Sequence, residues 1–162
     1  MVSRLVSYKR VDLVIDACTA LKLPLVVIGA GVEYARLRRI AGPNVTFISS
    51  VTDDELRQWY QNCEAFIFAG DEDFGIAAVE AQASGKPVIA YKNSGIAEIV
   101  IDGKTGALFH EQSVACIIQA LNTFHAGWYD KNLCIENAKR FSQAHFKKNI
   151  RSSIKLFIQK KR

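Results

Sequence analysis

Residues 65–91 read AFIFAGDEDFGIAAVEAQASGKPVIAY, and this stretch decides the fold. Two short apolar blocks, Ala65–Phe68 and Pro87–Tyr91, enclose an apolar, helix-like segment that runs from Gly75 to Ser84 and closes at Gly85. Continuous apolar blocks bounded by turn residues are typical of strands buried on both faces. A glycine directly after a helix favours its termination. Because two such strands joined through a helix form a right-handed parallel crossover, the stretch predicts a β-α-β unit.

The same alternation extends in both directions along the chain. Further apolar blocks predict strands at Val2–Val6, Leu25–Gly29, Val45–Ile48 and Ala107–Phe109. Helical patterns lie between and after them, at Lys9–Leu21, Glu33–Ala41, Asp53–Asn62, Gln112–Phe124 and Lys131–Arg140. Thr52 precedes one of these helices, with Glu55 in the position for a capping box. The order predicts an α/β protein with a doubly wound parallel sheet, whose ligands bind outside the carboxyl ends of the strands.

The composition fits one folded domain covering residues 1–162. With 49% hydrophobic residues and only 3 prolines, disorder is excluded, and we find neither a repeat nor a linker. No apolar run approaches the ~18–20 residues of a membrane span, and Met1 leads into a strand-like block without a signal peptide. Four cysteines stand far apart in apolar contexts, which predicts buried, reduced thiols in a cytoplasmic protein: Cys18, Cys63, Cys116 and Cys134.

Charge is distributed unevenly along the chain. From Asn137 onward the sequence holds nine of its 21 Lys and Arg residues and none of its 16 acidic residues. The segment at about 141–160 has helical apolar spacing. It predicts a basic amphipathic helix whose apolar residues pack on the domain: Phe141, Phe146, Ile150, Ile154 and Phe157. Such a helix also fits peripheral contact with anionic lipid headgroups, whereas nucleic acid is disfavoured because aromatic residues do not interleave with the basic ones.

Candidate binding residues gather after the first strand of residues 65–91. The acids Asp71–Asp73 precede Gly75, at which a helix begins. Free amides of Gly75 and Ile76 at the helix N-terminus favour a phosphate. Glu72 and Glu80 carry carboxylates that accept hydrogen bonds from sugar hydroxyls. Helix capping explains Asp71–Asp73 equally well, but it does not explain Glu80 on an apolar helix face.

Cations for a phosphate stand near the first predicted strand. Arg4 ends this strand and Lys9 follows five positions later, at the sheet edge where Gly75 is expected. An arginine binds phosphate through a bidentate fork, although a single basic residue at a strand end is usually solvated. After the second strand, Gly29 and Gly31 form a tight turn into a helix, and we expect this turn to line the ligand cleft.

Other chemistries find no support in the sequence. Gly103-Lys104-Thr105 lacks the earlier glycine of a P-loop. The three histidines, His110, His125 and His145, share no metal-ligand spacing. The nucleophile and zinc motifs G-x-S-x-G and H-E-x-x-H do not occur, so hydrolases and metalloenzymes are disfavoured.

Taken together, the motifs resemble a known family. They follow one another as Arg4 and Lys9, Val27–Gly31, Glu72–Ile76 with Glu80, Gly85–Ala90, Gly95 with Glu98, and Asp102–Gly106. This series resembles the C-terminal, donor-binding domain of family-4 retaining glycosyltransferases over nearly all of residues 2–125. The implied fold is the Rossmann-like half of a GT-B architecture. The sequence at residues 72–76 and 41–44 is most similar to that of bacterial mannosyltransferases of O-antigen and exopolysaccharide assembly.

The resemblance implies roles for the candidate residues. Arg4 and Lys9 would neutralise the donor diphosphate, as a metal ion does in other transferases, so no metal and no cofactor is expected. Glu72 would hydrogen-bond the transferred sugar. The predicted catalytic residues are therefore Arg4, Lys9 and Glu72. The predicted nucleotide-binding set comprises Gly75 and Ile76 for phosphate, Glu80 for ribose, Ser49 and Val51 for the base, and Gly29 and Gly31 along the cleft.

The resemblance also implies an activity. The expected reaction moves a sugar, here mannose from GDP-mannose, to a polysaccharide or lipid-linked acceptor with retained configuration. Such enzymes have an N-terminal acceptor domain, which is absent from this sequence, so the chain is expected to be inactive alone and to act in the cytoplasm or at the cytoplasmic membrane. Two alternatives remain: a non-catalytic nucleotide-sugar-binding module, and a fragment of a nucleotide-sugar epimerase, against which the length argues.

Overall fold

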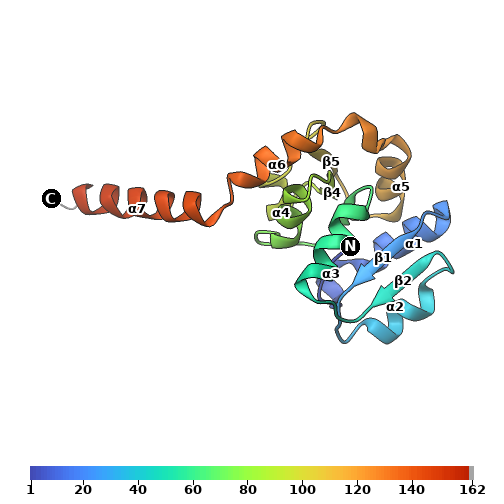
Figure 1. Ribbon diagram of the computed structural model, residues 1–162. Helices are drawn as coiled ribbons and strands as arrows, with labels where there is room; N and C mark the ends of the chain where they lie inside the picture. The colour runs from blue at the N-terminus through green and yellow to red at the C-terminus, as the bar shows by residue number, and fades with distance from the viewer. Residues whose placement is uncertain (161–162) are drawn as a thin grey trace.

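The computed structural model describes residues 1–160 (Figure 1). Strands β1 to β5 span Leu25–Ile28, Val45–Ile48, Phe66–Phe68, Val88–Tyr91 and Gly106–Phe109. Helices α1 to α7 span Val11–Leu21, Tyr34–Ile40, Asp53–Asn62, Ile76–Ala83, Val114–Thr123, Lys131–Lys139 and Gln143–Lys160. Short 3-10 helices η1 to η3 span Ser7–Lys9, Gly95–Glu98 and Ala126–Trp128.

All named strands pair in parallel, which confirms the predicted α/β class. They form two sheets, one of order β1-β2 and one of order β3-β4-β5. In the second sheet Phe66 pairs with Val88, and the crossover between these strands is α4, as residues 65–91 predict.

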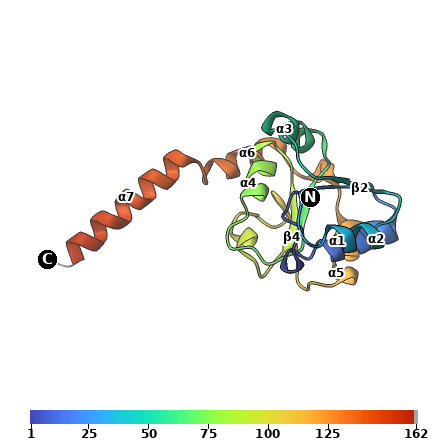
Figure 2. The same cartoon turned by 90° about the horizontal axis from the view of Figure 1, so that it is seen from below.

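Helices cover both faces of the strands (Figures 1 and 2). On one side α1 packs against α2 and α5, and on the other α4 packs against α3 and α6. This is the doubly wound arrangement that the alternating pattern predicts. The apolar faces of the helices meet the strands in one core, in which Val14, Ile89 and Ile117 are fully buried.

The N-terminal segment differs from the strand predicted at Val2–Val6. Only Val2 forms a β-bridge, parallel to Ile28. The amides of Ser3 and Leu5 still donate hydrogen bonds toward the β1 side, to the carbonyl oxygens of Ile28 and Ala30. Within residues 1–160 the segment forms no β-bridge to β3. The strand prediction is therefore wrong: β1 ends at Ile28, so from Ser3 onward the segment lies beside the turn at Gly29 and Gly31 instead of beside a strand.

Two glycines allow this segment to lie against the turn after β1. A Cβ atom on Gly29 would stand 1.9 Å from the carbonyl oxygen of Ser3, and one on Gly31 would stand 2.2 Å from that of Leu5. Gly29 also has a φ of 144°, which favours glycine. The glycines that the sequence suggested as cleft residues thus have a packing role.

The first long helix begins later than predicted. Instead of one helix from Lys9, η1 ends at Lys9, Arg10 adopts the left-handed conformation with φ of 47°, and α1 begins at Val11. By contrast, the capping box before α3 is confirmed. The Thr52 hydroxyl accepts from the Glu55 amide, and the Glu55 carboxylate accepts from the Thr52 amide at 2.7 Å.

A buried polar network joins α4, α6 and the loop before β5. The Gln82 amide nitrogen donates to the Thr105 hydroxyl at 3.1 Å. The Asn137 amide nitrogen donates at 2.6 Å to both the Gln82 side-chain oxygen and the Ile99 carbonyl oxygen. Gln82, Thr105 and Asn137 are all buried. Because an unpaired buried polar group is costly, this network fixes the two helices relative to the loop.

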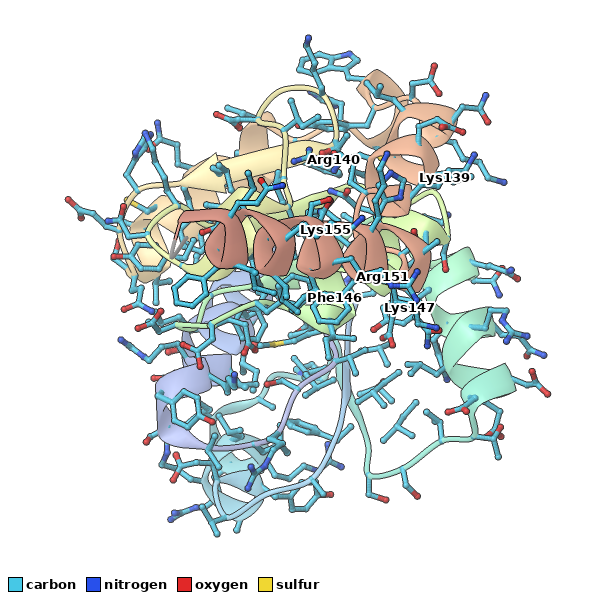
Figure 3. All side chains as sticks on the ribbon, turned by 90° about the vertical axis from the view of Figure 1, so that its left-hand side faces the viewer. Lys139, Arg140, Phe146, Lys147, Arg151 and Lys155 are labelled. Carbon is cyan, nitrogen blue, oxygen red and sulfur yellow. The ribbon has the colours of Figure 1, made fainter. Side chains whose placement is uncertain are left out.

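The C-terminal helix has the predicted extent but not the predicted packing. Phe141 packs on the core, with its ring 5.7 Å from that of Phe74. Beyond it α7 projects away from the domain, and Phe146, Ile150 and Ile154 are exposed (Figures 1, 2 and 3). The prediction that these side chains pack on the domain is therefore wrong. No helix among residues 1–160 is long and apolar enough to cross a bilayer.

The four cysteines are free thiols, as predicted. Cys18 and Cys134 are buried, whereas Cys63 and Cys116 are half-buried. Burial raises the pKa of the Cys18 thiol to about 11, so at neutral pH this group is a small core residue rather than a nucleophile.

Substitution Asn137→Ala should destabilise the protein. It removes the donor to two buried acceptors, and each unpaired buried group costs about 1–3 kcal/mol. Urea unfolding followed by circular dichroism should show a lower midpoint. The matched control is Asn132→Ala on the exposed side of the same helix, where the change should stay within about 0.5 kcal/mol. Equal midpoints for the two variants would contradict the role of the network.

Candidate functional site

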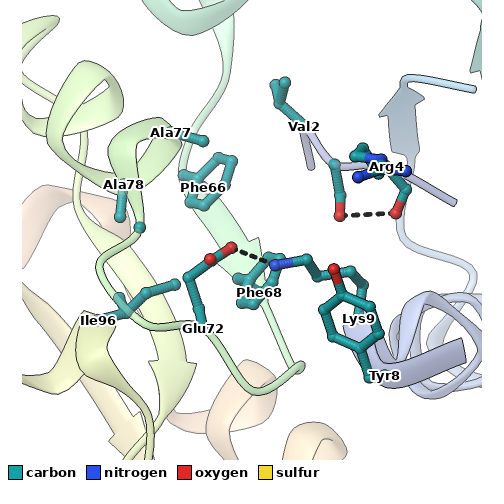
Figure 4. Close-up of a pocket in the computed structure, with 12 residues that line it drawn as sticks. Val2, Arg4, Tyr8, Lys9, Phe66, Phe68, Glu72, Ala77, Ala78 and Ile96 are labelled. Atoms are coloured by element: carbon teal, nitrogen blue, oxygen red, sulfur yellow. Dashed lines mark hydrogen bonds and ion pairs between the residues drawn. The ribbon is translucent and has the colours of Figure 1, made fainter. Parts of the chain in front are cut away.

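A cavity of about 200 Å³ lies between the N-terminal segment and the carboxyl end of β3 (Figure 4). Its walls include Arg4, Lys9, Glu72 and Gly75, four of the predicted site residues. They come from the N-terminal segment, from η1 directly after it, and from the loop between β3 and α4, where Glu72 lies 63 positions after Lys9. The position agrees with ligand binding outside the carboxyl ends of parallel strands.

Lys9 and Glu72 form an ion pair inside this cavity. The Lys9 Nζ and the Glu72 Oε2 lie 2.6 Å apart, and Lys9 is only 8% exposed (Figure 4). The ammonium also lies 4.8 Å from the ring centre of Tyr8 and 5.6 Å from that of Phe68, which are cation-π distances. A buried ammonium needs an anionic partner. In this structure the partner is Glu72.

The loop that carries Glu72 is held at two points. The Gly95 amide donates to the Glu72 carbonyl oxygen at 2.6 Å. Gly70 packs against the backbone of Lys9, where a Cβ atom would stand 2.5 Å from the Lys9 Cα. The backbones of both partners in the ion pair are therefore fixed before any ligand binds.

Arg4 and the start of α4 face the same cavity from opposite sides. Arg4 is exposed, and no carboxylate in the described part of the chain pairs with its guanidinium. Across the cavity, Gly75 is buried with a left-handed φ of 94° and packs against Ile96. The chain turns there into α4, whose first amides have no partner within the helix. A guanidinium, an ammonium and a helix N-terminus thus surround one space, which suits an anion.

Glu80 lies outside this cavity. It is exposed on α4, and its Oε2 accepts a hydrogen bond of 3.0 Å from the hydroxyl of Tyr60, which is buried. Burial and the neighbouring carboxylate both raise the pKa of the Tyr60 hydroxyl, so it remains a donor. Glu80, which helix capping could not explain, therefore accepts a hydrogen bond from a buried tyrosine on α3.

The remaining predicted residues do not line the cavity. The side chain of Ile76 is 66% exposed, whereas its amide, which carries the predicted role, is the first of α4. Ser49 and Val51 follow β2, and Gly29 and Gly31 contact the N-terminal segment. In residues 1–160 no cluster of His, Cys, Asp and Glu is arranged to hold a metal ion.

Sequence reasoning missed several residues of this site. Tyr8, Phe68 and Ile96 line the cavity, and Gly95 fixes the Glu72 loop. Tyr8 could have been predicted from the sequence, because it directly precedes Lys9 at the end of the N-terminal segment. The contact of Gly95 with residue 72 joins positions far apart in sequence, and nothing in the local pattern indicates it.

Comparison with known proteins identifies the family of this chain. The family model for glycosyl transferases group 1 matches residues 1–141. This chain belongs to that family. The predicted resemblance to a GT-B glycosyltransferase domain is thereby confirmed, and the match ends where α7 is about to begin.

Individual relatives of this group 1 glycosyltransferase domain include mannosyltransferases. The chain is 26% identical over 141 residues to O-antigen chain mannosyltransferase C of Escherichia coli, covering 82% of the chain and 38% of that protein. It is 33% identical over 108 residues to the GDP-mannose-dependent alpha-mannosyltransferase of Mycobacterium tuberculosis, covering 66% and 28%. The chain thus spans about a third of the length of these relatives.

A solved structure shares the fold. The structure of Anabaena HepE in complex with UDP and glucose superimposes with a TM-score of 0.81 at 23% identity. The match covers 94% of this chain and 46% of the HepE chain.

Substitution Gly95→Ala should disturb the Glu72 loop. The added Cβ would stand 2.1 Å from the Asp73 carbonyl oxygen and 2.6 Å from that of Glu72, so the loop has to move. We expect a loss of about 1–3 kcal/mol, the usual cost of overpacking, measured by urea unfolding. Gly127→Ala is the control, because a Cβ there meets nothing within 4 Å. A Gly95→Ala protein as stable as this control would show that the loop is not held as described.

Proposed function

We propose that this chain binds the nucleotide-sugar donor of a retaining glycosyltransferase, and that the donor is GDP-mannose. The observation that carries the proposal is the cavity in which Arg4, Lys9, Glu72 and the start of α4 converge. The choice of mannose is supported by the names of two relatives, a mannosyltransferase of O-antigen chains and a GDP-mannose-dependent mannosyltransferase. The former supports a polysaccharide or lipid-linked acceptor.

In the proposed complex the donor diphosphate occupies the space between Arg4 and the N-terminus of α4. Arg4 binds phosphate oxygens through its fork, Lys9 adds a point charge, and the first amides of α4 donate hydrogen bonds. As the bond between the sugar and the phosphate breaks, negative charge grows on the leaving diphosphate. The same three groups then stabilise the transition state, as preorganised charges and donors do.

Glu72 has a different part in this proposal. Its Oε2 is paired with Lys9, while its second carboxylate oxygen accepts a hydrogen bond from a hydroxyl of the transferred sugar. The acceptor hydroxyl attacks from the face that the diphosphate leaves, and its proton passes to a phosphate oxygen, so the configuration is retained. Arg4 and Lys9 supply the positive charge, and we propose that no metal ion is needed.

We propose that transfer also requires an acceptor-binding domain. The chain spans about a third of the length of its relatives, and Arg4, Lys9 and Glu72 are all assigned to the donor. Without a positioned acceptor the reaction forfeits much of the proximity term, which can reach about 7–11 kcal/mol. The 162-residue polypeptide alone should therefore bind donor without transferring sugar. The proposed place of action is the cytoplasm.

Calorimetry with nucleoside diphosphates tests the donor site directly. GDP should bind, more tightly than UDP or ADP, and binding should persist in EDTA because arginine and lysine provide the charge. Arg4→Ala should weaken GDP binding by about 1.5–3 kcal/mol, the range for a charge-assisted hydrogen bond. Arg57→Ala, at an exposed arginine of α3, is the control and should leave binding unchanged. Silence for all three nucleotides at millimolar concentration would refute the donor site.

The two glutamates should behave differently. Glu72→Gln should not weaken GDP binding, because it leaves the Lys9 ammonium free to pair with the diphosphate, and it should remove about 1 kcal/mol of the additional affinity that mannose contributes in GDP-mannose. Glu80→Gln should weaken GDP and GDP-mannose by the same amount if Glu80 contacts the ribose with the oxygen that Tyr60 does not use. Calorimetry with GDP and GDP-mannose on both variants distinguishes a contact to the sugar from a contact to the ribose. Equal losses for the two ligands at Glu72 would overturn its assignment to the sugar.

A further inference from the structure

One hydrogen bond between α3 and α4 joins a core residue to a surface carboxylate. The Tyr60 hydroxyl on α3 donates to the Oε2 atom of Glu80 on α4 at 3.0 Å. Tyr60 is only 4% exposed, whereas Glu80 lies at the surface. A carboxylate that could move freely in solvent is therefore tied to a side chain that the core holds in place.

Three contacts fix the position of Tyr60. Its ring lies 6.1 Å from that of Phe66 on β3, and Phe66 also lines the cavity. The helix that carries Tyr60 begins at the capping box of Thr52 and Glu55. Burial and the neighbouring Glu80 raise the pKa of the Tyr60 hydroxyl, so this group stays protonated at neutral pH. Because a buried hydroxyl without an acceptor is costly, Tyr60 retains Glu80 as its acceptor.

Glu80 lies one helical turn beyond the wall of the cavity. Gly75 and Ala77 line the cavity, and Glu80 follows Ala77 by three residues, so the two side chains share one side of α4. The rise along the helix axis from Ile76 to Glu80 is about 6 Å. A nucleotide whose diphosphate lies at the start of α4 therefore brings its ribose beside Glu80. A carboxylate accepts hydrogen bonds only, which suits the ribose hydroxyls.

We propose that Tyr60 is a positioning residue that orients the Glu80 carboxylate toward the ribose hydroxyls of the donor. A surface glutamate has several rotamers and loses this freedom when it binds a ligand. The hydrogen bond from Tyr60 fixes Oε2, so the second carboxylate oxygen has a set direction before the donor arrives, and less freedom is lost on binding. The inference rests on the proposed donor site and adds to it a residue that does not touch the ligand.

Calorimetry with three ligands on the full chain tests this role. The ligands are GDP, 2′,3′-dideoxy-GDP, which lacks both free ribose hydroxyls, and inorganic pyrophosphate, which lacks the nucleoside. The parent chain should bind GDP about fivefold more tightly than dideoxy-GDP, the factor of a typical hydrogen bond. Tyr60→Phe removes one oxygen atom and keeps the ring. It should lower this ratio at least about threefold by weakening GDP alone, with dideoxy-GDP and pyrophosphate bound as in the parent.

A matched control and a double variant separate positioning from packing. Tyr129→Phe removes the hydroxyl of a half-buried tyrosine between η3 and α6, which does not line the cavity, and should keep the affinity ratio of the parent. In a Glu80→Ala background, Tyr60→Phe should cause no further loss of GDP affinity, because the carboxylate that it orients is gone. Circular dichroism verifies that each variant is folded.

The outcomes distinguish this inference from the proposed function. An unchanged ratio in Tyr60→Phe, or equal losses for all three ligands, overturns the positioning role and leaves the donor site standing. Equal binding of GDP and dideoxy-GDP by the parent chain also overturns it, since Glu80 then does not reach the ribose. A parent chain that binds no GDP refutes the donor site itself, and the role of Tyr60 fails with it.

Discussion

The close approach of the first nine residues to three glycines is the constraint on which the site depends. Gly29 and Gly31 receive the backbone of the N-terminal segment, and Gly70 receives that of Lys9. At each position a side chain would occupy the space that the other backbone fills. The backbones of Arg4 and Lys9 are therefore positioned by these close contacts, and the side chain of Lys9 is held further by its ion pair with Glu72. Arg4 and Lys9 lie near the end of β3 because these glycines leave room for the N-terminal segment that carries them.

The ion pair of Lys9 and Glu72 follows from this placement. A lysine that is 8% exposed would be costly alone, and Glu72 compensates it at 2.6 Å. The pair connects the segment that runs beside β1 to the loop after β3, which belong to different sheets. Because Lys9 is paired with Glu72, the exposed guanidinium of Arg4 is the cation at this cavity that no carboxylate in the described residues neutralises. We therefore expect an entering anion to contact Arg4 first.

Local pattern was sufficient for much of the fold. The β-α-β unit in residues 65–91, the capping box at Thr52 and the helical segment near 141–160 all depend on neighbours in sequence, and the structure has them. The errors arise where distant residues decide. The segment at Val2–Val6 extends past the end of β1 and lies beside a turn, and the side chains of α7 beyond Phe141 do not reach the surface of the domain. The network of Gln82, Thr105 and Asn137 joins polar residues that look like surface positions in the sequence. Four candidate site residues meet in the cavity, because the alternating pattern predicts that the N-terminal segment and the loop after β3 lie at the same edge. Glu80 does not, because its partner Tyr60 lies on another helix.

The missing ladder between the N-terminal segment and β3 has a mechanical consequence. Backbone hydrogen bonds would lock two parallel strands at a spacing of about 4.8 Å. Here Val2 and Phe66 both line the cavity, and the nearest backbone contacts between the two sides are those of Gly70 and Asp71 with Lys9 and Tyr8 (Figure 4). Such a slot is compliant: it can widen or tighten around a guest through rotamer changes while every β-sheet hydrogen bond stays intact. The width of the cavity can therefore change while the strands and helices around it keep their positions.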